Sequence, residues 1–346
     1  MNAPGTPSMK HVAQAIGVSI MTVSLALRRA PSIPAATRER VLAAAAKLGY
    51  RPNPMVAALM AGLRGRRARN KAVHVIAYVE SFPLKRSPQE AAALRDYRQG
   101  AAAAAAKHGY RLEIFHLGES GLQEARLEQV LRARGIRGVI FSPFPSPGAT
   151  LNQSWENHAL ASIGYSLRKP VLHRAMNHQA HSMQLALAAL VDLGYRTIGV
   201  AIPRPQNERV ERIWLSSVLL AQRDYEGTET RFPLLIFDQG GRPLSTWLRR
   251  YRPEVVVTTE RELLPVLRRI GRAIQQQVGF VHLHITKDLA DWSGVDQNDE
   301  RIGAAAVDLV LEQLQGNDFG IPKNAKTVLI EGRWLPGKTA PGRKTG

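Results

Sequence analysis

The sequence predicts two folded parts, an all-helical N-terminal unit and a larger α/β unit built from two lobes. Positions 9–50 carry the apolar spacing of helices only, whereas short apolar strands alternate with helices from position 72 onward. Such alternation is typical of parallel sheets joined by right-handed crossovers. The length of 346 residues also allows more than one domain of roughly 150 residues.

The N-terminal unit should contain helices at 9–16, 20–28 and 35–48. The stretch VAQAIGVSIMTVSLAL at 12–27 has the pattern of two helices that cross at a short turn. Ala13 is small enough for a close helix contact, Gly17 allows the positive φ of the turn, and Val23 returns an apolar side chain to the first helix. Ser19 is placed to cap the second helix. The spacing predicts a helix-turn-helix; the alternative is a helical hairpin inside a core.

Basic residues are concentrated near the N-terminus. They outnumber acidic residues by 47 to 28, which gives a formal net charge of +19. Residues 1–70 contain eleven Lys or Arg and a single acid, Glu39, so this fifth of the chain carries 11 − 1 = +10. Such a concentration indicates a polyanionic partner, most often nucleic acid. The alternative is a solvated basic face that serves solubility.

A hinge at 53–71 should separate the helical unit at 1–52 from the α/β unit. Asn53 can cap a short helix and Pro54 can begin it. Apolar residues at i, i+3, i+4 and i+7 form one stripe: Val56, Leu59, Met60 and Leu63. So short a helix is marginal alone in water, and pairing with a symmetry mate would bury the stripe. Arg64 begins a basic run suited to phosphates. The alternative is a helix that packs between domains.

The α/β unit is expected at 72–336. Strands are predicted at 73–79, 112–115, 138–142, 159–164, 197–202, 234–237, 255–259 and 278–283, and helices at 90–108, 181–193, 263–274 and 300–314. So many strands suit two stacked lobes better than one sheet. The expected first lobe spans about 72–168 plus 299–320, and the second about 169–298 plus 321–336. The composition of 337–346 predicts a disordered basic tail.

The sequence lacks the residues or motifs that several classes of function require. The absence of cysteine excludes disulfides, thiolate zinc sites and a cysteine nucleophile. No enzymatic motif is recognisable, so neither an enzyme nor a cofactor is expected. His178 with His181, and His282 with His284, could hold a metal, but structural histidines are preferred and no metal is predicted. With no apolar run of roughly 20 residues and no secretory signal, we expect a cytoplasmic protein without a membrane partner.

The residues at 12–27, the stretch PAATRERVLAAAAKLGYRPN at 34–53 and the apolar stripe of the hinge resemble the headpiece of the LacI/GalR family of bacterial transcription regulators. The resemblance is close over 9–63 and weak beyond. It implies a periplasmic-binding-protein-like effector domain for the two lobes. It also implies a sequence-specific regulator, a ligand-responsive repressor that binds a pseudopalindromic double-stranded DNA operator as a homodimer and responds to a small-molecule effector.

By the same resemblance, Ile20, Met21 and Leu25 fall on the positions that read bases. Several members have an arginine at the position of Leu25, and leucine cannot make its bidentate hydrogen bonds to guanine. We therefore expect less discrimination per base and more reading of DNA shape. Ser19, Thr22, Ser24 and Arg28 are candidates for phosphate contacts. Leu59 falls where the family wedges a leucine into the minor groove. The predicted DNA-binding set is Ser19, Ile20, Met21, Thr22, Ser24, Leu25, Arg28, Asn53, Val56, Leu59, Met60 and Arg64.

A small ligand would bind between the lobes, where loops follow the carboxyl ends of strands. Arg212 matches an arginine that many family members use to hold an effector. Candidate residues for this site are Glu80, Phe82, Tyr165, Arg212, Glu260 and His284. For each of them, a plain loop or core role is the alternative. The pair Thr259 and Glu260 replaces a common Asn-Asp pair, so the sequence names no effector.

Two other classes of function remain open at this point. One is a ligand-independent architectural DNA-binding protein with a vestigial cleft, which the apolar base-reading positions favour. It predicts equal affinity for a fixed operator and for random DNA at matched salt. The other is an enzyme or a solute-binding protein of the transport type with an appended headpiece. It predicts that 72–336 alone retains catalysis or tight ligand binding.

Overall fold

The computed structural model describes residues 9–27, 33–48, 50, 74–81, 88–118, 122–238, 242–273 and 277–343. In its N-terminal unit, α1 (Met9–Ile16), α2 (Ile20–Leu27) and α3 (Ala35–Lys47) confirm the three predicted helices. Their apolar stripes meet in one small core, which consists of Val12, Ala13, Val23, Ala26, Val41 and Ala45. Each helix contributes two residues to this core, and the three buried faces shield one another from water.

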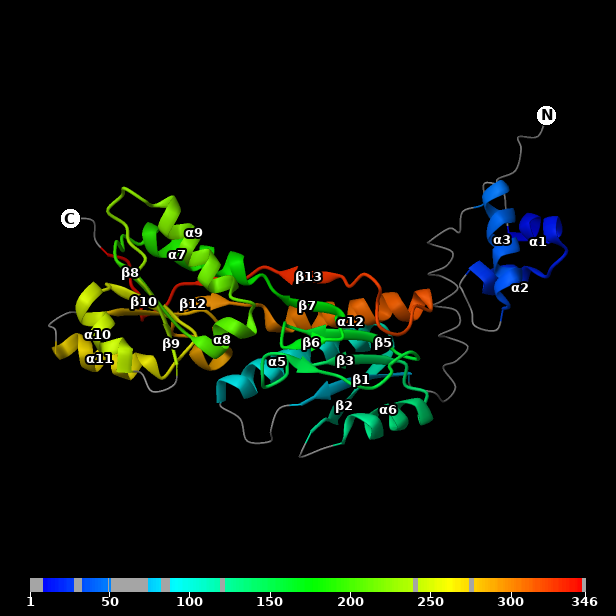
Figure 1. Cartoon of the computed structure of the whole chain (residues 1–346), viewed down its shortest axis with the longest axis horizontal. Helices are drawn as coiled ribbons and strands as arrows, with labels where there is room; N and C mark the ends of the chain where they lie inside the picture. Colours follow the sequence, from blue (N-terminus) through cyan, green and yellow to red (C-terminus); the bar gives the residue numbers. More distant parts are fainter. Residues whose placement is uncertain are drawn as a thin grey trace.

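The first lobe contains a parallel sheet that includes six described strands, in the order β13-β7-β5-β3-β1-β2 (Figure 1). Their bounds are β1 (His74–Glu80), β2 (Tyr110–His116), β3 (Gly138–Phe141), β5 (Ala159–Ile163), β7 (His173–Asn177) and β13 (Thr327–Ile330). A minor ladder joins β4 (Ala149–Thr150) to β6 (Leu167–Lys169). Side chains alternate along β1, so that Ile76 packs on one face and Ala77 on the other.

Helices cover both faces of this sheet. On one face lie α5 (Pro88–Lys107) and α12 (Asp299–Gly316), and on the other lies α6 (Glu124–Ala133). The backbones of α5 and α12 approach very closely, because a Cβ at Gly303 would lie 1.9 Å from the carbonyl oxygen of Tyr97. Glycine is therefore required at position 303. This contact fixes the N-terminal end of α12, which carries the residues that face the second lobe.

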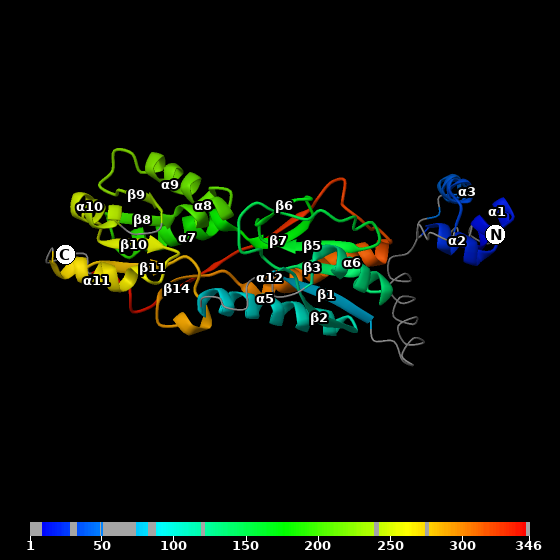
Figure 2. The same cartoon turned by 60° about the horizontal axis from the view of Figure 1, so that its bottom comes forward.

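The second lobe contains a sheet with six described strands in the order β14-β12-β11-β10-β8-β9. These are β8 (Ile198–Pro203), β9 (Leu234–Phe237), β10 (Val255–Thr258), β11 (Gly279–His282), β12 (Ser293–Asp296) and the antiparallel β14 (Arg333–Leu335). On one face lie α7 (Gln179–Asp192) and α9 (Ile213–Asp224), and on the other α10 (Arg242–Tyr251) and α11 (Leu263–Ala273) (Figure 2). The short α8 (Arg204–Arg209) and the 3₁₀ helix η1 (Lys287–Leu289) follow β8 and β11.

The chain passes between the lobes after β7, between β12 and α12, and between β13 and β14. The predicted lobe boundaries differ from this path, because the prediction places 169–177 and 321–330 in the second lobe. In the structure β7 and β13 pair with each other in the first sheet. The segment HRAMN of β7 is polar in sequence but fully buried, so that no apolar run marks it as a strand. Tertiary pairing, not local pattern, decides where the lobes begin and end.

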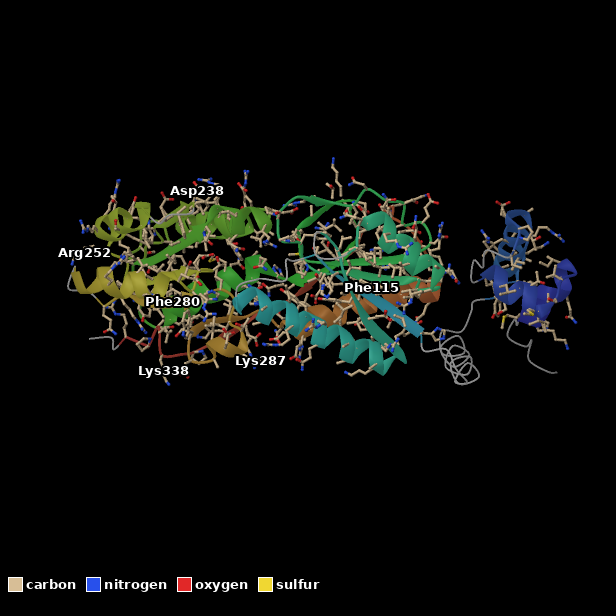
Figure 3. The ribbon with its side chains drawn as sticks, turned by 90° about the horizontal axis from the view of Figure 1, so that it is seen from below. Phe115, Asp238, Arg252, Phe280, Lys287 and Lys338 are labelled. Atoms are coloured by element: carbon tan, nitrogen blue, oxygen red, sulfur yellow. The ribbon has the colours of Figure 1, made fainter. Side chains whose placement is uncertain are left out.

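The prediction of a disordered tail is wrong for 337–343. The Thr339 hydroxyl donates to the Phe280 carbonyl at 2.7 Å, and the Tyr195 hydroxyl donates to the Pro341 carbonyl at 2.8 Å. The Lys338 backbone N–H donates to the Asp291 carbonyl at 2.8 Å, and Figure 3 places Lys338 and Phe280 in the second lobe. Composition suggested disorder, but the second lobe supplies partners for this polar backbone. The last three residues of the predicted tail lie outside the described residues.

No single helix among the described residues is long and apolar enough to cross a membrane, and only the bent pair α1 and α2 passes that test, by length and composition alone.

Candidate nucleic-acid interface and interlobe cavity

The first two helices form a helix-turn-helix. The chain bends by 106° between α1 and α2. Gly17 adopts a φ of 69° at the turn, and the Val18 N–H donates to the Ala13 carbonyl at 3.1 Å. Ala13 and Val23 are buried where the helices meet. The small residue, the glycine and the returning valine therefore occupy the places that their spacing predicted.

The N-terminus of α2 is capped and exposed. The Ser19 hydroxyl accepts from the Thr22 N–H at 3.0 Å, which confirms Ser19 as the cap, and lies 2.8 Å from the Thr22 hydroxyl. Ile20 is 48% exposed and Met21 72% exposed. Ser24 and Leu25 are half-buried on the same helix. Two large apolar side chains thus stand in solvent on the helix end that would enter a groove.

Several predicted DNA-binding residues lie outside the described residues: Arg28, Asn53, Val56, Leu59, Met60 and Arg64. The same holds for Phe82 among the predicted effector-binding residues. The hinge helix and its role in DNA binding stay predictions from the sequence.

A cavity of about 410 Å³ lies between the two lobes. On the side of the first lobe it is lined by α5 and by residues at the carboxyl ends of β5 and β7. On the side of the second lobe it is lined by α8, α9 and the segments that follow β10, β11 and β12. This is the position at which ligands bind in parallel α/β sheets.

Buried amides form one wall of the cavity. The Trp214 indole N–H donates to the Gln179 side chain at 3.0 Å, and the Gln179 amide donates to Gln297 at 3.4 Å. The Gln297 amide then donates to the Leu283 carbonyl at 2.8 Å. Asn177 completes the group, because its amide donates to the Gln297 carbonyl at 3.4 Å and its oxygen accepts from the Ser182 hydroxyl at 2.8 Å. This hydrogen-bond network holds the side-chain amides at the cavity wall in fixed orientations.

A histidine and a carboxylate meet at the cavity from opposite lobes. His284 Nε2 lies 2.7 Å from Asp299 Oδ2, and His284 lines the cavity. Burial opposes a charge on His284, but Asp299, with smaller contributions from Asp296 and Asp96, raises the pKa of His284 above its ordinary value. Burial and then the charge of Asp299 hold the pKa of Tyr97 well above its ordinary value.

The two arginines near α8 lie in different places. Arg209 lines the cavity and donates to the Phe144 carbonyl at 2.6 Å and to the Pro145 carbonyl. Arg212 is not among the described residues that line the cavity. It contributes to a separate, open depression with Arg168, Glu208 and Glu211. It stands just before α9 with a φ of 62°, one turn beyond the part of α8 that faces the cavity.

The other predicted effector-binding residues divide in the same way. Tyr165, Glu260 and His284 line the cavity. Glu80 does not line it: this side chain is buried, and the Arg98 guanidinium donates to it at 3.2 Å. Sequence reasoning missed Tyr97, Asn177, Gln179, Trp214 and Gln297. None of these belongs to a recognisable motif. Asn177 ends β7 and Gln297 follows β12, and no apolar run predicted either strand.

The histidine pairs have structural partners. His178 caps α7, since its Nδ1 accepts from the His181 N–H at 3.2 Å. His282 is fully buried, and its Nδ1 lies 2.7 Å from the His284 carbonyl oxygen. Within the described part of the chain no three His, Asp or Glu side chains gather as metal ligands.

Comparisons with known proteins agree with this geometry. Residues 8–53 match the family model described as bacterial regulatory proteins, lacI family. The HTH-type transcriptional regulator PtxS of Pseudomonas plecoglossicida is 27% identical over 330 residues, which cover 90% of this chain and 90% of PtxS.

Solved structures share the fold of the whole chain. The lac repressor dimer bound to operator and the anti-inducer ONPF has a TM-score of 0.54 at 16% identity, covering 97% of this chain and 100% of that one. The complex of the transcriptional regulator CelR with cellobiose has a TM-score of 0.52 at 18% identity, covering 96% and 99%. A lacI-type headpiece is thus joined to the two-lobed fold of these regulators. The chain is thus similar to bacterial regulatory proteins of the lacI family over residues 8–53, and to the transcriptional regulator PtxS over 90% of its length.

Proposed function

We propose that this protein represses transcription as a homodimer on a pseudopalindromic operator, and that a small molecule in the interlobe cavity controls its affinity for DNA. The observation that carries the proposal is the exposure of Ile20 and Met21 at the capped N-terminus of α2. The second helix of a helix-turn-helix enters the major groove by this end. Apolar side chains there can contact thymine methyl groups.

One headpiece presents too few side chains to select a site alone. A two-fold symmetric dimer places two recognition helices on two half-sites, which requires an operator with the same symmetry. The predicted hinge, with Leu59 as a minor-groove wedge and Arg64 beside phosphates, would join the two halves over the centre of the site. The lac repressor structure, a dimer bound to operator, supports this arrangement by analogy.

The cavity supports control by a ligand because both lobes build it. A molecule that binds one arrangement of the lobes better than another shifts their equilibrium, and the shift changes the fit of the paired hinges to DNA. The cellobiose complex of CelR supports a small-molecule effector by analogy, although the cavity residues here name none. The protein needs no cofactor, catalyses no reaction and acts in the cytoplasm, where it meets its operator.

Selection from a random DNA pool by the full-length protein tests the proposal. We expect one enriched pseudopalindrome, bound at least a thousandfold more tightly than random DNA at the same salt concentration. A second candidate function, an architectural DNA-binding protein, is favoured by the apolar residues Ile20, Met21 and Leu25, which read few hydrogen-bonding groups. An affinity ratio near one would establish that second function and contradict the first.

A further inference from the structure

We propose that His284 and Asp299, one from each lobe, form a proton-dependent clasp that holds the interlobe cavity closed. The regulatory meaning of the clasp rests on the function proposed above, whereas the clasp itself is a property of the two lobes. His284 follows β11 in the second lobe, and Asp299 begins α12 in the first. Their 2.7 Å contact therefore bridges the lobes at the wall of the cavity.

The two ends of the clasp are held in place independently. His282 Nδ1 lies 2.7 Å from the His284 carbonyl oxygen and 3.1 Å from the His284 backbone nitrogen, so His284 is held beside β11 in its own lobe. Asp299 is fixed by the close crossing of α12 and α5, at which Gly303 meets the Tyr97 carbonyl. Because His284 is held by the second lobe and Asp299 begins a helix of the first, separation of the lobes should lengthen their contact.

A second contact between the lobes lies beside the first. Lys287 of η1, labelled in Figure 3, reaches Glu300 at 2.8 Å and Asp96 at 4.0 Å. The Lys287 side chain is 64% exposed, so water and salt screen its pairs. The Asp299 side chain is only 8% exposed and that of His284 17%. Because the His284–Asp299 pair is largely shielded from water, salt screens its attraction less than it screens the pairs of Lys287.

The groups around His284 are predominantly acidic on the side of the first lobe. Asp299 and Asp96 face it from α12 and α5, and Asp296 faces it from the end of β12. From its own lobe, His282 of β11 faces it, and burial lowers the pKa of His282 to about 4, so this neighbour is neutral near pH 7. Other titratable or charged groups line the same cavity, namely Glu260 and Glu262 after β10, Tyr97 on α5, Tyr165 after β5 and Arg209 on α8.

The sign of the proton dependence follows from these neighbours. In the closed state burial opposes the charge, yet Asp299 raises the pKa of His284 above 6.5. In an open state His284 is exposed to water and separated from Asp299, so its pKa returns toward the ordinary value. Closure therefore takes up a proton. The charged His284–Asp299 contact stabilises the closed state in full below pH 6.5. This stabilisation is lost as the pH rises through the raised pKa of His284.

The chain contains no cysteine, which allows labels to be placed at will. We would combine Ala125→Cys on α6 with Leu220→Cys on α9, attach spin labels and measure the distance between them in the full-length protein without DNA or ligand. Mixing with excess unlabelled chain removes distances between subunits. We expect one short distance below pH 6.5 and a growing longer population as the pH rises through the raised pKa of His284. His284→Gln should lose this pH response, whereas the exposed His108→Gln should keep it.

A wild-type distance that does not change with pH, or a His284→Gln variant that responds like the wild type, would overturn the clasp. Should His284→Gln fail to fold, the titration of the wild-type His284 ring by NMR decides instead, and a pKa at or below 6.5 would overturn it. The selection of DNA at one fixed pH does not depend on these results. Failure of the clasp and failure of the proposed function are therefore distinguishable.

Discussion

Gln313 of α12 forms two hydrogen bonds to the backbone of Leu160 in β5. Its side-chain oxygen accepts from the Leu160 N–H at 2.9 Å, and its amide donates to the Leu160 carbonyl at 3.0 Å. The neighbouring strand β7 pairs with β5 only from Ala161 onward. Leu160 therefore extends beyond the ladder on that side, and a glutamine side chain satisfies both of its main-chain groups. The side-chain amide of Gln313 thus makes the two hydrogen bonds that the backbone of a residue in a neighbouring strand would make.

Replacing this glutamine should destabilise the first lobe. Gln313→Leu leaves the buried N–H and carbonyl of Leu160 without this partner, at a cost of about 1–3 kcal/mol for each group. Urea unfolding at neutral pH measures the loss. Gln315→Leu, an exposed position on the same helix, serves as the control and should unfold within about 0.5 kcal/mol of the wild type. Equal midpoints for both variants would contradict the structural role of Gln313.

The exposed end of α2 should govern the selection of DNA without governing stability. Met21→Ala removes a side chain that is 72% exposed, so we expect an unchanged unfolding temperature. Its affinity for the selected operator should fall by roughly tenfold, because an apolar side chain of this size contributes about 1.5 kcal/mol or more when it is buried, here against thymine methyl groups. Leu42→Ala, which truncates an exposed residue of α3, is the matched control. A similar loss in both variants would indicate a general effect on the headpiece instead.

The predicted wedge can be tested through specificity. Leu59→Ala should weaken binding to the operator much more than binding to random DNA, since an inserted side chain stabilises only the kinked site. Titrations of both DNAs at the same salt concentration give the two losses. If they are equal, Leu59 does not insert, and the hinge is better interpreted as a helix that packs between domains.

Arg209 should affect ligand binding, and Arg212 should not. A thermal-shift screen of small polar molecules first identifies compounds that stabilise the wild type, because a ligand that binds only the folded state raises its unfolding temperature. Arg209→Ala should abolish that shift, since this guanidinium lines the cavity and bonds to the first lobe. Arg212→Ala should retain it. If Arg212→Ala abolishes the shift and Arg209→Ala retains it, the effector binds at Arg212, as the family resemblance implied.

His282 should make the fold sensitive to acid. Burial lowers its pKa to about 4 in the native state, so between pH 6.5 and 4 the unfolded chain binds a proton that the native chain does not. Stability should therefore fall as the pH decreases, by on the order of 3 kcal/mol from this residue. His158 and His173 act in the same direction, since burial lowers their pKa values as well. Comparing urea unfolding of wild type and His282→Gln across this range isolates one residue. Parallel curves would exclude His282 as the cause.

The sequence alone determined the headpiece. Ala13, Gly17, Ser19 and Val23 act within one pair of helices, and the contacts that they make are local. Apolar runs such as 159–163 and 255–258 likewise identified buried strands, because a strand covered on both faces is apolar throughout. These features need no knowledge of distant residues. They sufficed to indicate DNA binding and a two-lobed domain.

Only the tertiary structure decided the lobe boundaries, the ordered tail and the composition of the cavity. The polar strand β7 is a strand because β5 and β13 pair with it, and 337–343 is ordered because the second lobe accepts its hydrogen bonds. Arg209 lines the cavity, and Arg212 does not, because one turn of chain separates their positions. His284 and Asp299 meet because the chain passes repeatedly between the lobes. Contacts between residues far apart in sequence leave no periodic signal, so folding alone brings them together.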